Sequence, residues 1–181
     1  MKRALTLIAV SLVLWGCGPE QTTKDKEDQQ MAVDAKATRD RLSPAVGVYV
    51  GTLTAIDGNV MSVRMTLGLV NIPYNNPARS DVTTIPALLG SMEQCMDAGC
   101  FDTPTTDQTS VFTFPVTSAK YTAMDNYGNV VVTFDTSAVA GKPQSMTLVG
   151  KLVGNHLVGN ILTSNRPANP VVDMQRISKV R

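Results

Sequence analysis

The chain has 181 residues, with 16 Lys and Arg against 15 Asp and Glu, which gives a formal net charge of +1. This balance leaves no basic excess to neutralise phosphates, so the composition gives no electrostatic support for a nucleic-acid partner and we expect none. Only 17% of the residues are charged, below the ~25% that is usual for soluble domains. With one His, three Cys and one Trp, there is little material for catalysis or metal binding, and we expect neither an enzyme nor a cofactor.

Residues 1–16 have the pattern of an export signal. Lys2 and Arg3 precede an apolar stretch from Ala4 to Trp15, which is shorter than the ~20 apolar residues that a transmembrane helix needs. The stretch ends in Leu14-Trp15-Gly16-Cys17, which resembles the lipobox of bacterial lipoproteins. The resemblance implies cleavage before Cys17, attachment of diacylglycerol to its thiol, and N-acylation of the new N-terminus.

The same resemblance implies a location for the mature protein. Gly18 follows the cysteine, at a position where Asp in the enterobacterial pattern implies retention in the inner membrane. We therefore expect a lipid-anchored protein of the bacterial outer membrane on its periplasmic face, with surface exposure left open. Two or three acyl chains give stable anchoring, since each buried CH₂ contributes ~0.8 kcal/mol. Ordinary secretion without a lipid is the alternative.

Residues 17–44 differ in composition from the rest of the chain. Eleven of these 28 residues are charged, against 18 of the 137 that follow. A mixed-charge stretch that is poor in large apolar residues cannot bury enough surface to offset its ordering entropy. We predict a flexible tether here. Residues 31–42 include good helix formers, so a short helix remains an alternative there, including a helix that binds a partner.

Residues 45–181 are expected to form an all-β domain. Met61 to Leu69 alternates apolar and polar side chains, as a half-buried strand does, and the Asp57-Gly58 pair before it is a strong hairpin signal. The pattern predicts one short helix at 85–94. It predicts strands at 46–56, 59–70, 111–116, 119–124, 130–135, 145–153, 156–163 and 171–177.

About eight closely spaced strands predict a small antiparallel β-barrel, with a β-sandwich as the alternative. The chain is rich in β-branched residues, with 22 Val and 20 Thr, which suit a pleated sheet. The opening Gly47-Val48-Tyr49 resembles the Gly-x-Trp start of lipocalin-type barrels, with Tyr in place of Trp. That resemblance adds to the expectation of a barrel.

Cys95 and Cys100 are the most distinctive local pair. In an oxidising periplasm, two nearby cysteines with a Gly between them can close a small loop, so we predict a disulfide. The alternative is a metal site, because soft sulfur ligands select Cu(I). Four such donors lie within nine residues: Met92, Cys95, Met96 and Cys100.

Other polar residues give no clear catalytic constellation. His156 would need a nucleophile and an orienting carboxylate to act as a general base, and no common catalytic motif occurs in the chain. Oxygen donors at 125–129 suggest calcium, but turn chemistry explains them. The Pro- and Asn-rich segment 72–81 is a candidate recognition loop or a plain connection.

We therefore expect a non-enzymatic module that binds an envelope protein or has a structural role in the envelope. Nine Met residues suit either core filling or an adaptable apolar cavity. A carrier of a lipophilic ligand in the barrel cavity is thus one alternative. A Cu(I)-binding module at the four sulfur donors is the other.

Overall fold

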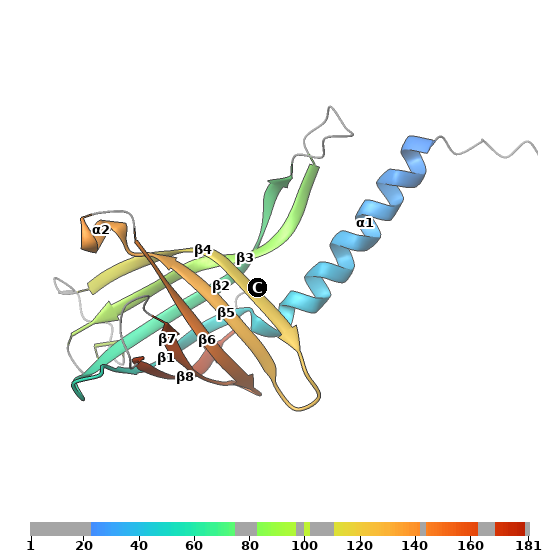
Figure 1. Ribbon diagram of the computed structural model, residues 1–181. Helices are drawn as coiled ribbons and strands as arrows, with labels where there is room; N and C mark the ends of the chain where they lie inside the picture. Colours follow the sequence, from blue (N-terminus) through green and yellow to red (C-terminus); the bar gives the residue numbers. More distant parts are fainter. Residues whose placement is uncertain are drawn as a thin grey trace, which may run out of the picture. The chain divides into compact units, whose positions relative to one another are not determined.

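The computed structural model describes residues 23–74, 83–96, 100–101, 111–141, 144–162 and 169–179. They form helix α1 (Thr23–Leu42), a 3₁₀ turn (Ser43–Ala45), the one-turn helix α2 (Ser137–Ala140) and eight strands (Figure 1). The strands are β1 (Gly47–Thr54), β2 (Val60–Tyr74), β3 (Thr83–Cys95), β4 (Val111–Ala123), β5 (Gly128–Asp135), β6 (Ser145–Val153), β7 (His156–Leu162) and β8 (Val171–Ser178).

The eight strands form one closed antiparallel barrel in which each strand pairs with the next along the chain. The barrel closes where β1 pairs with β8, with Leu53 opposite Val172. Close approach of β6 and β7 is permitted by the facing pair Gly150 and Gly159, since a Cβ on Gly159 would lie 2.6 Å from the Cα of Gly150. The prediction of a small all-β barrel of eight strands is confirmed, and the sandwich alternative is wrong.

Strand β5 shows why these residues form a barrel. Val130, Val132 and Phe134 point inward and are buried, whereas Asn129 and Thr133 on the other face are partly exposed. This period of two is what a sheet with one buried face requires. Similar alternation in the other strands produces one contiguous core inside the barrel.

The sequence-based helix at 85–94 is wrong, because these residues belong to strand β3. Its helix formers, such as Leu89 and Glu93, favour a helix locally, but 13 cross-strand pairs with β2 override that preference. The two strands expected at 111–116 and 119–124 are one strand, β4, with a register shift between Val116 and Ser118. The expected number of strands is therefore right, although two expected strands form the single strand β4 and strand β3 was not expected.

Helix α1 occupies much of the segment that the composition predicted to be a tether. The chain divides into two compact units, 1–33 and 34–181, so only the last turns of α1 belong to the barrel unit. In those turns Ala35 and Thr38 are half-buried and Leu42 is buried, on one face of the helix. None of the helices in the described residues has the length and apolar character needed to cross a bilayer.

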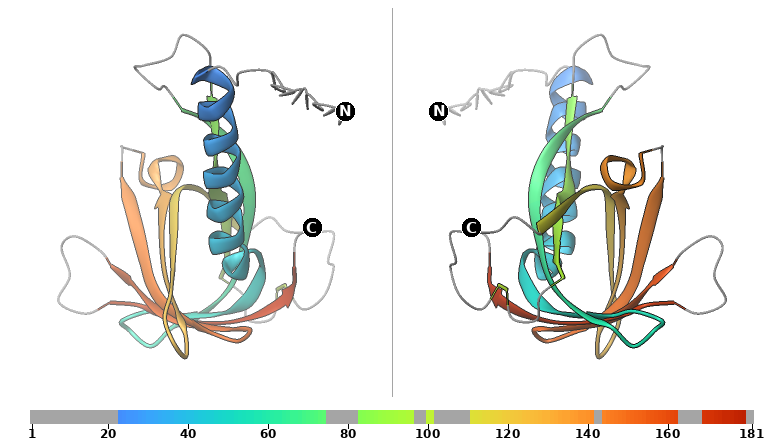
Figure 2. Two further views of the ribbon diagram at one scale, coloured as in Figure 1. Left: turned by 90° about the vertical axis from the view of Figure 1, so that its right-hand side faces the viewer. Right: turned by 90° about the vertical axis from the view of Figure 1, so that its left-hand side faces the viewer.

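Strands β2 and β3 extend beyond their neighbours. The pairing of β2 with β1 ends at Leu67, and the pairing of β3 with β4 ends at Leu88. Beyond these points, residues 68–74 and 83–87 pair with each other, up to Tyr74 opposite Thr83. We call this two-stranded extension the ribbon, and Figure 2 shows it (green) running past the other strands.

Candidate binding site at the far end of the barrel

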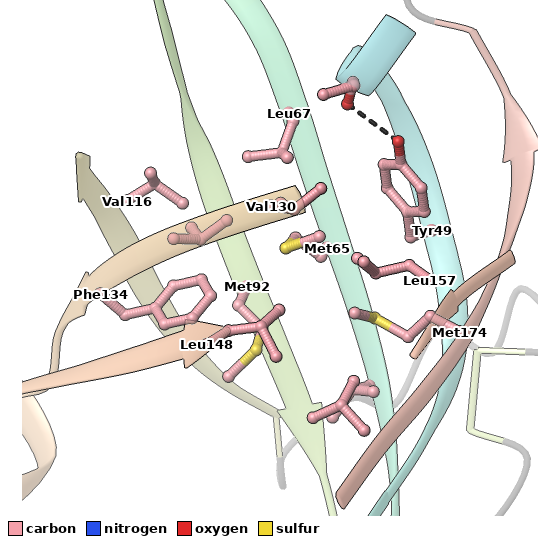
Figure 3. Close-up of a cluster of buried hydrophobic side chains, with 14 of the residues drawn as sticks. Tyr49, Met65, Leu67, Met92, Val116, Val130, Phe134, Leu148, Leu157 and Met174 are labelled. Atoms are coloured by element: carbon pink, nitrogen blue, oxygen red, sulfur yellow. Dashed lines mark hydrogen bonds between the residues drawn. The ribbon is translucent and has the colours of Figure 1, made fainter. Parts of the chain in front are cut away.

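One end of the barrel is closed by the chain that leads into it. We call it the helix end, because α1 ends there at Leu42. Leu42, Ala45 and Val46 are buried and belong to the barrel core. The Tyr49 hydroxyl donates a hydrogen bond of 2.9 Å to the Ala45 carbonyl, drawn in Figure 3. Burial raises the pKa of Tyr49, although the nearby Arg176 guanidinium opposes this. The 3₁₀ turn, which we call the stopper, thus closes this end of the barrel.

Arg176 on β8 holds the stopper in place. Its Nη1 donates 2.6 Å to the carbonyl of Pro44, and its Nη2 donates 3.0 Å to the carbonyl of Gly154. Nη2 and Nε also donate to Asn155 Oδ1, at 2.6 and 3.0 Å, and the guanidinium lies 5.9 Å from the Tyr49 ring centroid. One planar cation therefore ties β8, the β6–β7 turn and the N-terminal segment together.

The interior of the barrel is filled by side chains. Figure 3 shows Met65, Met92, Phe134 and Leu148 directed toward one another. An acyl-chain cavity would leave free surface on the side chains that line it. Several inward-facing side chains have no exposed surface: Val63, Met65, Leu67, Met92, Val132, Phe134, Leu148, Leu157, Val172 and Met174. This favours the core-filling interpretation of the methionines over a deep ligand cavity.

The opposite end, which we call the far end, presents apolar side chains that are only partly covered. Phe112 faces inward at the start of β4, opposite Gln94 on β3, and is 43% exposed. Met61 and Met146 are half-buried and pack against the core. Gln94 Nε2 lies 2.7 Å from Met61 Sδ. The far end therefore offers partly covered apolar side chains, two of them flexible methionines, together with the amide of Gln94.

An ion pair and an aromatic ring support this end from outside the barrel. Arg64 Nε on β2 pairs with Glu93 Oε2 on β3. The Arg64 guanidinium carbon lies 4.7 Å from the Phe101 ring centroid, a cation–π contact. Ser62 and Cys95 face the same outer side, directly opposite each other, and are almost fully buried. Phe101, which follows β3 in the chain, thus lies against the outer wall of the barrel.

The predicted cysteine pair is brought together in this segment. Cys95 and Cys100 lie at disulfide distance, with their Cα atoms 6.5 Å apart. The other two sulfur donors of the Cu(I) alternative lie in different surroundings, because Met92 is fully buried in the core whereas Met96 is 57% exposed. No group of three or more His, Cys, Asp or Glu suited to a metal ion occurs within the described ranges.

Replacing both Cys95 and Cys100 by serine is expected to lower the free energy of unfolding by about 2 kcal/mol, because the cross-link reduces the number of conformations open to this small loop in the unfolded chain. Urea unfolding measures this change, and reduction of the parent protein with dithiothreitol is the matched control. Equal unfolding midpoints for the parent protein, the reduced parent protein and the double variant would contradict a stabilising cross-link.

His156 forms an exposed pair with Asp173, with 2.6 Å between Nε2 and Oδ1. In the described part of the chain, no Ser, Thr or Cys side chain is hydrogen-bonded to this ring. Residues 124–127 connect β4 to β5, and the Met124 N–H donates to the Tyr127 carbonyl. Cys17 and residues 75–81 of the candidate loop lie outside the described residues, and residues 72–74 end strand β2.

No protein-family model matches the chain, and neither a curated protein nor a solved structure matches it. The candidate site therefore rests on its own geometry. Sequence reasoning missed Phe112, Gln94 and Arg176. Phe112 shares the period of two of the buried Phe114 and Val116, which is a signal that it faces inward, but only the barrel shows that its strand begins at an end. Arg176 continues the period of two of the buried Val172 and Met174, and a charge at such a position was a signal that could have identified the closing contact.

Proposed function

We propose that this chain is a lipid-anchored, non-enzymatic binding protein of a bacterial outer membrane that faces the periplasm and binds an envelope protein. The lipobox resemblance of Leu14 to Cys17 supports the anchor. A disulfide between Cys95 and Cys100 suits an oxidising compartment. The filled interior supports action through the surface of the barrel rather than through a carried ligand.

The observation that carries the binding proposal is the partial exposure of Phe112 at the far end. An aromatic ring that faces inward in register and keeps free surface is suited to receive an apolar side chain from a partner, and the flexible side chains of Met61 and Met146 lie at the same end of the barrel. Gln94 adds an amide oxygen that accepts no hydrogen bond from the described residues, so it can accept one from the partner. The packed core below limits such an insertion to a shallow depth.

Phe112→Ser is expected to weaken binding of the neutral probe N-phenyl-1-naphthylamine to the mature protein ~5-fold, through the loss of ~1 kcal/mol of apolar contact. Fluorescence titration measures the dissociation constant. Val158→Ser is the matched control, because Val158 is 40% exposed but lies on the outer barrel wall. Equal affinities for all three proteins would contradict the site.

A second measurement, made in cells, distinguishes a protein partner from a lipid. A photo-crosslinking residue at position 112 is expected to yield a discrete adduct with an envelope protein, and the same residue at position 158 is expected to yield none. An adduct with lipid alone would replace the protein partner by a lipophilic ligand, the alternative that a filled core makes less favourable.

A further inference from the structure

The ribbon has two faces of different character. On one face, Asn71 lies opposite Pro86, and Asn71 Oδ1 accepts a hydrogen bond of 2.7 Å from Arg39 Nη2 in the last turns of α1. Pro86 is buried on this same face. The inner face of the ribbon is therefore buried next to the barrel, at Pro86, and Arg39 contacts it at Asn71. The outer face continues the outside of the barrel wall.

The outer face of the ribbon is apolar and open. It carries Val70, Ile72, Tyr74 and Ile85, with Val70 opposite Ala87 and Ile72 opposite Ile85. Val70, Tyr74 and Ile85 are 39%, 47% and 41% exposed. No charged residue occurs in 68–74 or 83–92, although charged side chains are a common device for keeping open strand edges from associating.

The position of the ribbon relates it to the anchor. It projects from the helix end of the barrel, the end at which residues 34–42 join. Its seven residues beyond Leu67 reach ~23 Å. Cys17 lies at most ~40 Å from Asp34, because six residues of any conformation reach no more than ~21 Å and the helical residues 23–33 add ~17 Å. A lipid on Cys17 thus keeps a bilayer within range of the ribbon.

We propose that the outer face of the ribbon is a membrane-contact surface, which rests on the leaflet that holds the Cys17 lipid; this inference rests on the lipid anchor of the proposed function. An uncharged face of branched aliphatic side chains fits the acyl boundary of a bilayer. Tyr74, at the end of the ribbon, is of the residue type that favours the headgroup level. The ribbon gives the protein a second attachment that fixes its orientation on the membrane.

The choice of a bilayer over a protein follows from the anchor distance and the composition. A protein interface usually adds a polar rim with hydrogen bonds around its apolar centre, and the described ribbon residues include no charged side chain on either face. A second copy of the chain is the rival occupant, through pairing of the open ribbon edges. The experiment below separates the two.

The mature protein lends itself to a fluorescence test. The one Trp of the full chain, Trp15, precedes Cys17, so a mature protein that begins at Cys17 has none. Tyr74→Trp then gives a single reporter on the ribbon, and Phe112→Trp gives a matched reporter at the opposite end. Each acylated protein is reconstituted into vesicles of three parts phosphatidylethanolamine and one part phosphatidylglycerol, with brominated acyl chains as quenchers.

Quenching of the reporter at position 74 but not at position 112 is expected, and adding Val70→Ser and Ile85→Ser should remove it while urea unfolding remains cooperative. Equal quenching at both positions, or none at 74, would overturn the membrane contact. Emission from position 74 that shifts to the blue with protein concentration in detergent would assign the face to a second copy. The mass of the acylated protein tests the lipid anchor separately. A failure of the anchor can therefore be distinguished from a failure of the membrane contact.

Discussion

Replacing Phe134 by alanine is expected to lower the free energy of unfolding by about 3–5 kcal/mol. Phe134 has no exposed surface and lies among Met92, Leu148 and Val132 in the barrel core. Removing the ring costs its transfer free energy and leaves a void that the surrounding strands can only partly close. Urea unfolding followed by circular dichroism measures the loss.

The size of this effect distinguishes a filled barrel from a ligand cavity. Phe112→Ala is the matched control, since its ring is already 43% exposed, and we expect a loss of about 1 kcal/mol or less there. The void in Phe134→Ala should bind benzene, and the parent protein should not. A loss below about 1 kcal/mol for Phe134→Ala would show that the ring faces free space, as a carrier of lipophilic ligands requires.

Replacing Arg176 by methionine is expected to lower the free energy of unfolding by about 3 kcal/mol, because hydrogen bonds made by a charged donor contribute about 1.5–3 kcal/mol each and are not additive. Methionine keeps the aliphatic stem but removes the donors to Pro44, Gly154 and Asn155. Hydrogen exchange should accelerate in the stopper and the residues that follow it, up to Tyr49, before it does in β5.

The pattern of rescue tests whether the planar guanidinium matters beyond its charge. Arg176→Lys is expected to recover less than half of the loss, since an ammonium cannot reach three carbonyl groups from one fixed fork. Protection of the stopper that is identical in the parent protein and in Arg176→Met would contradict the closing role. Val153→Met, on the exposed outer wall, controls for the added methionine.

The fold could be predicted from local alternation because most strands have one buried face. Residues 61–69 and 145–163 follow this period. Short turns join β1 to β2 and β6 to β7. Strand β3 could not be predicted in this way, because Ala87, Leu88 and Leu89 form a continuous apolar run with helix-forming neighbours. Its state depends on β2, a partner outside any local window.

Helix α1 shows the opposite limit. Its residues have helix propensity but little apolar surface, so composition favoured a tether. In the barrel unit its last turns gain support from contacts that are distant in sequence, such as Arg39 with Asn71. Burial of Leu42 in the barrel core supplies the rest. Such tertiary support is not visible in a pattern of charges.

The candidate site depended even more on three-dimensional placement. The predicted pairing of Cys95 and Cys100 needed only a compartment and a spacing, and the two residues do lie at disulfide distance. Phe112, Gln94 and Met61 come from three strands, and their meeting follows from strand register. No spacing in the sequence encodes that register.

Intact-mass spectrometry of the protein extracted from outer membranes tests the central claim most directly. The lipid-anchor account predicts a chain that begins at Cys17 and carries a diacylglyceryl group and an N-linked acyl group, less two hydrogens for the disulfide. Cys17→Ala should lack both lipid groups, whereas the Cys95→Ser, Cys100→Ser variant should keep them. An unmodified chain that begins at another residue and is recovered from the soluble fraction would contradict the account.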